Sequence, residues 1–411
     1  MDQQRVVVSG IGLISPIGSS TDVFFDSLVK GNPGIKEISA FKTDGFKSKL
    51  AGEIVNFAAR NFISSKNIRY LDKISQFSIA AANLALNDSN LIINDKNYSK
   101  IGIVLGSMYF GLNSLSEVQR ILLEDKEKKI SPMIFPNTVP NSPVSQVSIE
   151  LGVKSLCTMM STGFCSSTDA IGWSVNYIRK GMAQAIFVGG AEELNQYIYG
   201  IFEKNGLLSY SNSHNKEQCA PFNTSRNGLI LSEGAAVLLL ESYNSAKERN
   251  AKIYGEIIGY GGNYCASSMK KYDYDSAYTT RAMECAIKDA LVEKNDIDYI
   301  CTEGNGTVLS DQFEADAIKH VFDKINKKIP ISSIKSVLGH TVGAAGAFNV
   351  VATLLSMREN VIPPVLNFDE NADTFGLEFI SNKARSANIR YALTNSFCPW
   401  GNVSSLVIRN I

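Results

Sequence analysis

Short apolar runs, most of them bounded by glycine, alternate with longer stretches along this chain. The runs lie at residues 6–8, 101–105, 185–188, 236–240, 254–261, 299–301 and 404–408. Such runs are typical of strands that are buried on both faces. The stretches between them, including a helix expected at residues 280–292, would supply the helices that cover these strands. The pattern therefore predicts a layered α/β fold.

The runs form two similar series, one on each side of residue 250. We therefore expect two domains, residues 1–250 and residues 251–411. The sequence similarity between the two series is faint, so this prediction rests on the order of the elements.

The helix predicted after residue 165 is a clear local signal. Ile171, Val175 and Ile178 are spaced i, i+4 and i+7, so they mark one apolar face, and the helix is expected to end at Gly181. Phe164 and Cys165 then lie at the N-terminus of a largely buried helix. A thiol in this place is normally activated, because the helix dipole favours the thiolate.

Composition narrows the classes of partner. The 411 residues suffice for two to three domain-sized units, and 40 basic side chains balance 40 acidic ones. Zero net charge gives no reason to expect nucleic acid or an anionic membrane, and it fits a chain that hides surface in an oligomer. The first apolar stretch, residues 6–18, is broken by Gly and Pro, so we expect a strand and turn there and not a signal peptide. No stretch approaches about 20 apolar residues, so no membrane span is expected.

Cysteine and histidine usage points away from a metal centre. The seven Cys are irregularly spaced without a CxxC pair, and His214, His320 and His340 are scattered. We expect no metal site, no disulfide framework and no cofactor, and we expect a cytoplasmic location because the thiols would stay reduced there.

A series of short motifs runs through the whole chain. They are 6–12 (VVVSGIG), 129–132 (KISP), 189–192 (GGAE), 221–222 (PF), 232–235 (SEGA), 304–307 (GNGT) with Asp311, 335–346 (KSVLGHTVGAAG) and 395–397 (NSF). In this order and at these intervals, the chain resembles the β-ketoacyl synthases. The resemblance implies a thiolase-like fold, with two similar βαβαβ-type halves in a layered αβαβα core.

The resemblance also implies a set of catalytic positions. In this family a Cys thiolate takes an acyl group from a carrier protein, two His and a Lys support condensation, and two backbone N–H groups form an oxyanion hole. Carried over by motif, the nucleophile position falls on Phe164, the first His position on Glu303 and the oxyanion Phe position on Pro399. Lys335 and His340 match the family.

Each altered position lacks the group that the chemistry needs. Phe164 has no thiol, the Glu303 carboxylate would repel an enolate, and Pro399 has no N–H. Cys165 lies one residue further along the helix, a rotation of roughly 100°, so we expect it to point away from the site. We therefore expect no catalytic residue.

The two matching residues have two interpretations. We expect Glu303 to pair with Lys335, and we expect Lys335 and His340 to support the fold through hydrogen bonds. A surviving half-site is the alternative. Trp400 replaces a Gly of the family loop, so any left-handed conformation at that position becomes costly.

A ketosynthase-like chain without its nucleophile resembles the chain-length factors of type II polyketide synthases. The resemblance implies a heterodimer with an active ketosynthase, an interface tunnel that sets polyketide length, and an acyl carrier protein as a further partner. Such subunits often carry Gln at the nucleophile position, where this chain has Phe164. Candidate tunnel residues, for each of which ordinary core is the alternative, are Tyr109, Phe110, Leu112, Leu115 and Met133.

Two other functions stay open. One is a working condensing enzyme for fatty acids or polyketides that uses Cys165, which must also explain Glu303 and Pro399. The other is a structural or regulatory thiolase-fold homodimer without an acyl substrate.

Overall fold

The computed structural model describes residues 4–64, 68–124, 126, 129–213, 215–266, 276–325, 327–370 and 375–411. The main strands of the first half are β1 (Val6–Ile14), β4 (Ile101–Gly106), β5 (Cys157–Met160), β6 (Ala185–Glu192) and β7 (Gly234–Ser242). Those of the second half are β8 (Gly255–Tyr264), β9 (Tyr299–Cys301), β10 (Pro330–Ser332), β14 (Tyr391–Phe397) and β15 (Asn402–Arg409). Each predicted apolar run lies in or overlaps one of these strands.

The two sets of strands have the same topology. The first half has the order β5-β4-β6-β7-β1 and the second half the order β10-β9-β14-β15-β8. In both orders the first three strands are parallel and the remaining neighbours are antiparallel. The predicted boundary near residue 250 lies between β7 and β8, and it stays a prediction.

One continuous sheet results from the contact between the two sets. β1 and β8 pair antiparallel through Val7 with Glu256 and Val8 with Gly255, and β12 (Glu378–Phe379) adds an edge strand beside β10. Among the described residues the sheet therefore has eleven strands. The sequence did not predict this junction, since it rests on a two-residue ladder.

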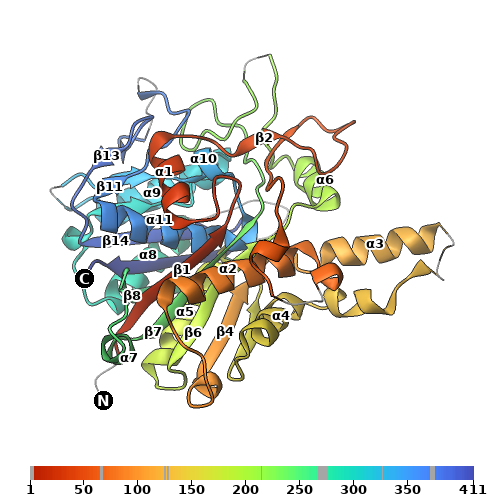
Figure 1. The fold of residues 1–411 in the computed structure, drawn as a ribbon. Helices are drawn as coiled ribbons and strands as arrows, with labels where there is room; N and C mark the ends of the chain where they lie inside the picture. Colours follow the sequence, from red (N-terminus) through yellow and green to blue (C-terminus); the bar gives the residue numbers. More distant parts are fainter. Residues whose placement is uncertain are drawn as a thin grey trace.

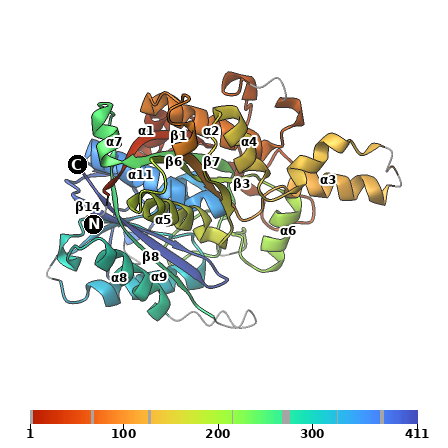
Figure 2. The same cartoon turned by 90° about the horizontal axis from the view of Figure 1, so that it is seen from below.

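Helices cover the sheet in layers, as Figure 2 shows from top to bottom. On the outer side of the first half lie α2 (Lys73–Ser89) and α4 (Ser142–Leu151), and on that of the second half lie α8 (Ser276–Asp289) and α9 (Val308–Phe322). Between the two sets of strands lie α5 (Ser166–Arg179) and α11 (Ala345–Glu359), whose apolar residues share one core with β1 and β7. The predicted thiolase-like αβαβα arrangement is confirmed.

The two predicted helices are present with shifted bounds. The helix after Cys165 ends at Arg179, and Gly181 follows with a φ of 73°. The helix expected at residues 280–292 is α8, which begins at Ser276 and ends at Asp289. Helix ends depend on local capping and fray by one or two residues, so sequence periodicity places them only approximately.

Smaller elements complete the fold. The helices are α1 (Thr21–Lys30), α6 (Gln196–Lys204), α7 (Tyr243–Glu248) and α10 (Lys335–Leu338), and the strand pairs are β2 (Ile35–Glu37) with β3 (Leu50–Gly52) and β11 (Val361–Ile362) with β13 (Arg385–Ser386). Short 3-10 helices include η5 (Pro132–Thr138), η6 (Gly163–Cys165) and η8 (Val342–Ala344).

An arm projects from this layered body. It consists of α3 (Leu112–Leu123) and the returning segment with η5, and Figure 1 shows it extending away from the sheet. Ser114 is the one buried residue within α3, so the helix gains little from packing on its own chain. We call α3 and η5 the arm below.

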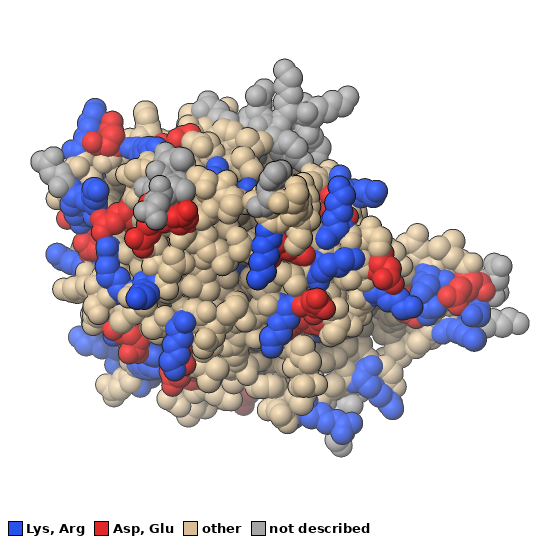
Figure 3. Space-filling model, turned by 90° about the horizontal axis from the view of Figure 1, so that it is seen from above, with Lys and Arg blue, Asp and Glu red and all other residues tan. Residues whose placement is uncertain are grey.

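Charges are mixed over the surface. On the face in Figure 3, Lys and Arg alternate with Asp and Glu around uncharged areas. No described helix combines the length and the hydropathy needed to cross a membrane.

Candidate functional site

Phe164 lies at the centre of the molecule, in the 3-10 turn η6 that leads into α5. Its side chain is fully buried. The ring centroid lies 4.3 Å from that of His340, 5.8 Å from that of Trp400 and 6.2 Å from that of Phe202. A buried aromatic ring of this kind removes about 150–250 Å² from solvent. The space beside the predicted nucleophile position is therefore filled by packed rings.

The predicted tunnel residues lie in two different surroundings. Tyr109 and Leu112 pack against the same apolar cluster as Phe164. Leu115 and Met133 lie on the arm and are each 50% exposed, and Phe110, which is partly buried, precedes the arm in the sequence. The structure therefore brings only the first two near the centre, and the described residues do not test a tunnel role.

Glu303 links the two matching family residues. Its Oε1 lies 2.6 Å from Nε2 of His340, and its Oε2 lies 3.4 Å from Nζ of Lys335. All three side chains are buried. The expected contact with Lys335 is present, whereas the shorter contact with His340 was not predicted.

The proton of His340 can be assigned from its neighbours. The backbone N–H of Val342 donates to Nδ1 at 3.0 Å, so Nδ1 acts as an acceptor and Nε2 carries the proton. Burial lowers the pKa of His340, which keeps the ring neutral despite the nearby Glu303. The Nε2–H group donates to Glu303. The imidazole therefore has no free donor for a substrate oxygen.

A second buried carboxyl group holds the turn around Glu303. Glu314 Oε1 accepts from the Glu303 N–H at 3.0 Å, and Oε2 accepts from the Gly304 N–H at 2.8 Å. Asn395 donates to Glu314 as well, and Lys335 Nζ also lies 3.4 Å from Asn349 Oδ1. Burial raises the pKa of Glu314 to about 8. These contacts are those expected if Lys335 and His340 support the fold through hydrogen bonds, a role that stays a prediction.

Glu192, in the GGAE motif, ties the loop after β4 to the turn after His340. Its carboxyl group accepts from Ser107 Oγ at 3.0 Å and from the N–H groups of Met108, Tyr109 and Gly343 at 2.9, 3.1 and 3.1 Å. Burial raises its pKa to about 7. The sequence motif signalled this residue, but its four partners could not be deduced from the motif.

The thiol of Cys165 lies against β14 and β15. Its Sγ donates toward the carbonyl oxygens of Ser396 at 3.1 Å and Asn402 at 3.2 Å, on β14 and β15. The side chain is fully buried, and burial raises its thiol pKa well above the usual value. A protonated thiol that faces the sheet is a poor nucleophile.

The loop between β14 and β15 closes the other side of Phe164. Pro399 carries no N–H group, and Trp400 packs its ring against Phe164. Trp400 does not take a left-handed conformation, and it is Gly401 that has a φ of 103°. The expected strain at Trp400 is therefore avoided, because the loop places its left-handed residue one position later.

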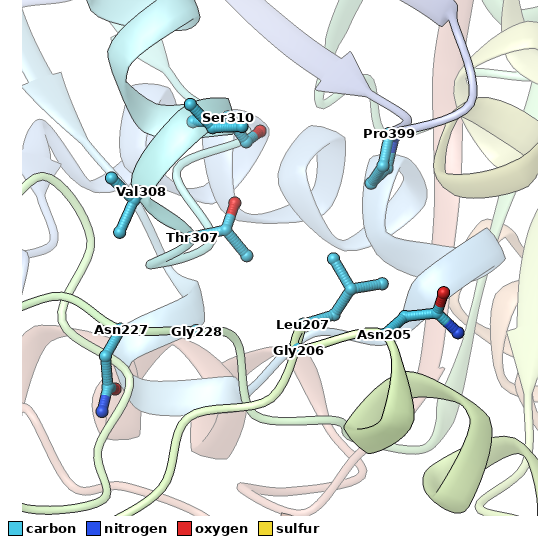
Figure 4. Close-up of a pocket in the computed structure, with 10 residues that line it drawn as sticks. Asn205, Gly206, Leu207, Asn227, Gly228, Thr307, Val308, Ser310 and Pro399 are labelled. Carbon is cyan, nitrogen blue, oxygen red and sulfur yellow. The ribbon is translucent and has the colours of Figure 1, made fainter. Parts of the chain in front are cut away.

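A small cavity opens beside this loop. It has a volume of about 180 Å³ and lies between Leu207, Thr307 and Pro399, as Figure 4 shows. Ligand sites for drug-sized molecules usually measure about 300–1,000 Å³, so this cavity is smaller than such sites.

Among the described residues, no group of three or more His, Cys, Asp or Glu side chains is placed to hold a metal ion.

Comparison with known proteins identifies the family. The sequence matches the N-terminal domain model of β-ketoacyl synthases over residues 3–246 and the C-terminal domain model over residues 254–369. The chain is 32% identical to 3-oxoacyl-[acyl-carrier-protein] synthase 2 of Vibrio harveyi, with 100% of both chains covered. It is also 32% identical to the protein of that name from Staphylococcus aureus N315, with 99% of this chain and 98% of the relative covered.

Solved structures agree with the sequence matches. The ishigamide ketosynthase/chain length factor superposes with a TM-score of 0.93 at 27% identity, with 100% of both chains covered. The AntDE:AntF complex, a type II polyketide synthase acyl-carrier protein with its ketosynthase, gives 0.90 at 30% identity with the same coverage. The chain therefore belongs to the β-ketoacyl synthase family of acyltransferases.

Proposed function

We propose that this chain is a non-catalytic, ketosynthase-like subunit of a type II polyketide synthase. In this role it pairs with an active ketosynthase, and the two subunits enclose a tunnel that sets the length of the growing polyketide. An acyl carrier protein delivers the acyl groups to the partner.

The buried ring of Phe164 is the observation that carries the proposal. A condensing enzyme needs a thiolate, a hydrogen-bond donor for the enolate and space for the acyl chain. At the centre of this chain the ring of Phe164 fills the space, and the Nε2–H of His340 donates to Glu303. The structural neighbour described as a ketosynthase/chain length factor adds support.

A reconstituted complex tests this proposal. The chain is co-purified with the ketosynthase that is recovered with it from its own cells, and condensation from a malonyl-loaded carrier protein is followed by mass spectrometry. Cys165→Ala in this chain is expected to leave the rate within about twofold, whereas inactivating the ketosynthase's nucleophile abolishes product. Loss of product with Cys165→Ala alone would overturn the proposal.

The second candidate is a working 3-oxoacyl synthase, and the relatives favour it. Proteins bearing that enzyme's name match the chain over its full length. This candidate requires Cys165 to reach an acyl group, although its Sγ faces β14 and β15. The chain alone should then condense an acyl group with a malonyl unit, and that activity should disappear with Cys165→Ala.

A further inference from the structure

Two carboxyl groups meet at the start of α2. Asp72, which precedes the helix, accepts from the N–H of Ser75 through Oδ1 at 3.1 Å. Glu193, which follows β6, accepts from the N–H of Ile74 through Oε2 at 3.2 Å. Ile74 and Ser75 are consecutive, so their N–H groups are neighbours in the first turn and point out of the same helix end. The two carboxyl groups therefore lie side by side.

Each carboxyl group also has an oxygen without a hydrogen-bond partner in the described part of the chain. These oxygens are Oδ2 of Asp72 and Oε1 of Glu193, and both are shielded from solvent. Two ionised carboxylates in this place would repel each other, and each would keep a buried oxygen without a donor, which costs free energy. A single proton removes both penalties, because a protonated carboxyl group donates to the free oxygen of its neighbour.

The other charged groups near the pair are Arg69, Lys73, Glu117, Arg120, Glu192 and Glu233. Lys73 Nζ binds Oε1 of Glu233 at 2.6 Å. Arg120 binds Glu117 at 2.7 Å. Glu192 turns its carboxyl group toward the loop after β4. Among the described residues, no hydrogen bond from any of these groups reaches the two free oxygens, whereas a proton between them would satisfy both.

The segment that follows β6 also holds the base of the arm. Asn113, in the first turn of α3, donates to the carbonyl of Leu194 at 3.5 Å and accepts from the side-chain amide of Asn195. The N–H of Leu194 in turn donates to Glu233 at 3.0 Å. The arm is therefore connected to the start of α2 through residues 193–195.

We propose that Asp72 and Glu193 share one proton and that this proton acts as a pH-sensitive latch, which fastens the base of the arm to α2. The inference goes beyond the proposed function and does not depend on it. When hydroxide removes the proton as water, two negative charges face each other, and the segment that begins at Glu193 separates from α2. The arm then loses the support of its first turn.

The pH range of the latch follows from the pKa of Glu193. Burial raises this pKa to about 8, and the charge of Asp72 raises it further. The folded value therefore lies above the unfolded value of about 4.3. The latch contributes its full stability below the unfolded pKa, and that stability is lost as the pH rises through about 8.

Carbon-13 NMR of the full chain, with labelled Asp and Glu side-chain carboxyl groups, locates the proton. The signals of the pair are those that disappear in Asp72→Asn and in Glu193→Gln. We expect one carboxyl group of the pair to titrate near pH 8. In each variant the midpoint of the remaining acid should fall by at least about one pH unit, because its neighbour is then uncharged and offers an N–H donor.

Hydrogen exchange of the full chain, followed by mass spectrometry, measures the latch itself. After correction for the intrinsic rise of exchange with pH, residues 110–116 and 193–198 should exchange about tenfold faster at pH 9 than at pH 7. Glu193→Gln gives Asp72 a permanent donor, so it should cut this rise to less than about threefold. The remainder would come from Glu192, whose pKa burial raises to about 7.

Glu248→Gln is the matched control, at an exposed carboxyl group on α7, and it should keep the full rise. Thermal unfolding confirms that each variant folds. Asp72→Asn keeps a residue that caps helices well, and it replaces Glu193→Gln should the glutamine variant not fold.

The outcomes are distinct. A tenfold rise that Glu193→Gln loses and Glu248→Gln keeps supports the latch. A rise of equal size in all three proteins overturns it, and so does the absence of a rise in the unmodified chain. Titration of both carboxyl groups below about pH 6 would overturn it as well. None of these results bears on the non-catalytic role.

Discussion

The buried centre around Phe164 and the projecting arm differ in the solvent exposure of their apolar side chains. At the centre, the rings of Phe164, Phe202 and Trp400 contact one another and leave no exposed surface at Phe164. On the arm, Leu122 is 51% exposed and Phe135 is 68% exposed. Chemistry needs open space at the centre, whereas association needs exposed apolar surface. The proposed non-catalytic role rests on this contrast.

Removing Glu303 should have the largest effect on the centre. Glu303→Ala leaves the buried Lys335 without its carboxylate and His340 without its acceptor, so we expect the free energy of unfolding to fall by about 3–5 kcal/mol. Urea unfolding of the isolated chain measures this change. Glu117→Ala, which breaks an exposed pair with Arg120 on the arm, is the control and should cost less than about 1 kcal/mol. If both variants lowered the free energy of unfolding by less than about 1 kcal/mol, the Glu303 contacts would be no more important for stability than an exposed ion pair on the arm.

Charges placed on the arm should weaken partner binding without unfolding the chain. Leu115 and Leu122 lie seven residues apart on one face of α3, so Leu115→Glu/Leu122→Glu puts two charges on its exposed apolar surface. We expect the Kd for the ketosynthase to rise at least about 10-fold, that is by about 1.4 kcal/mol or more. Ile92→Glu, at an exposed residue outside the arm, should leave the Kd unchanged. Unchanged binding by the double variant would exclude the arm as the interface.

The buried carboxyl groups at the centre should make stability depend on pH. Because burial raises the pKa of Glu314 to about 8 in the folded chain, the folded state holds a proton that the unfolded state has released. This contribution is fully present below the unfolded pKa and is lost as the pH rises through about 8. Between pH 7 and 8.5 the contribution of Glu314 to the unfolding free energy should therefore fall by on the order of 1 kcal/mol.

Two variants isolate that dependence. Glu314→Gln cannot titrate and should make the slope between pH 7 and 8.5 less steep, whatever its effect on overall stability. A slope remains, because burial also raises the pKa of Glu192 to about 7 and that of Glu193 to about 8. Glu117→Gln alters an exposed carboxyl group whose pKa is lowered by Arg120, so its slope should match that of the unmodified chain. A slope that Glu314→Gln leaves unchanged would show that Glu314 does not hold the proton.

The smallest expected effect is a change in product length, caused by a substitution at the base of the arm, where it meets the buried centre. Leu112 packs with the cluster around Phe164 and begins α3. Leu112→Trp adds bulk at the proposed tunnel, so the complex with the ketosynthase should release a shorter product, as measured by liquid chromatography and mass spectrometry. Leu123→Trp, at the exposed far end of α3, is the control. Identical product lengths would remove Leu112 from the tunnel proposal.

Much of the fold followed from local patterns, because a buried strand or helix face leaves a periodic trace in the sequence. The Ile171, Val175 and Ile178 face predicted α5, and the apolar runs predicted the strands. The side-chain contacts in the site could not be predicted from the sequence. The contact between Glu303 and His340, and the sulfur of Cys398 beside Gly163, join positions 37 and 235 residues apart. Motif spacing placed these residues in one region, but side-chain direction depends on how the loops fold.

Native mass spectrometry of the chain purified from its own cells tests the non-catalytic role most directly. The account predicts recovery with a second chain of similar size, which carries an acyl group on its own Cys while this chain stays unmodified. Recovery as a homodimer with an acyl group on Cys165 would contradict the account and identify the chain as a working synthase.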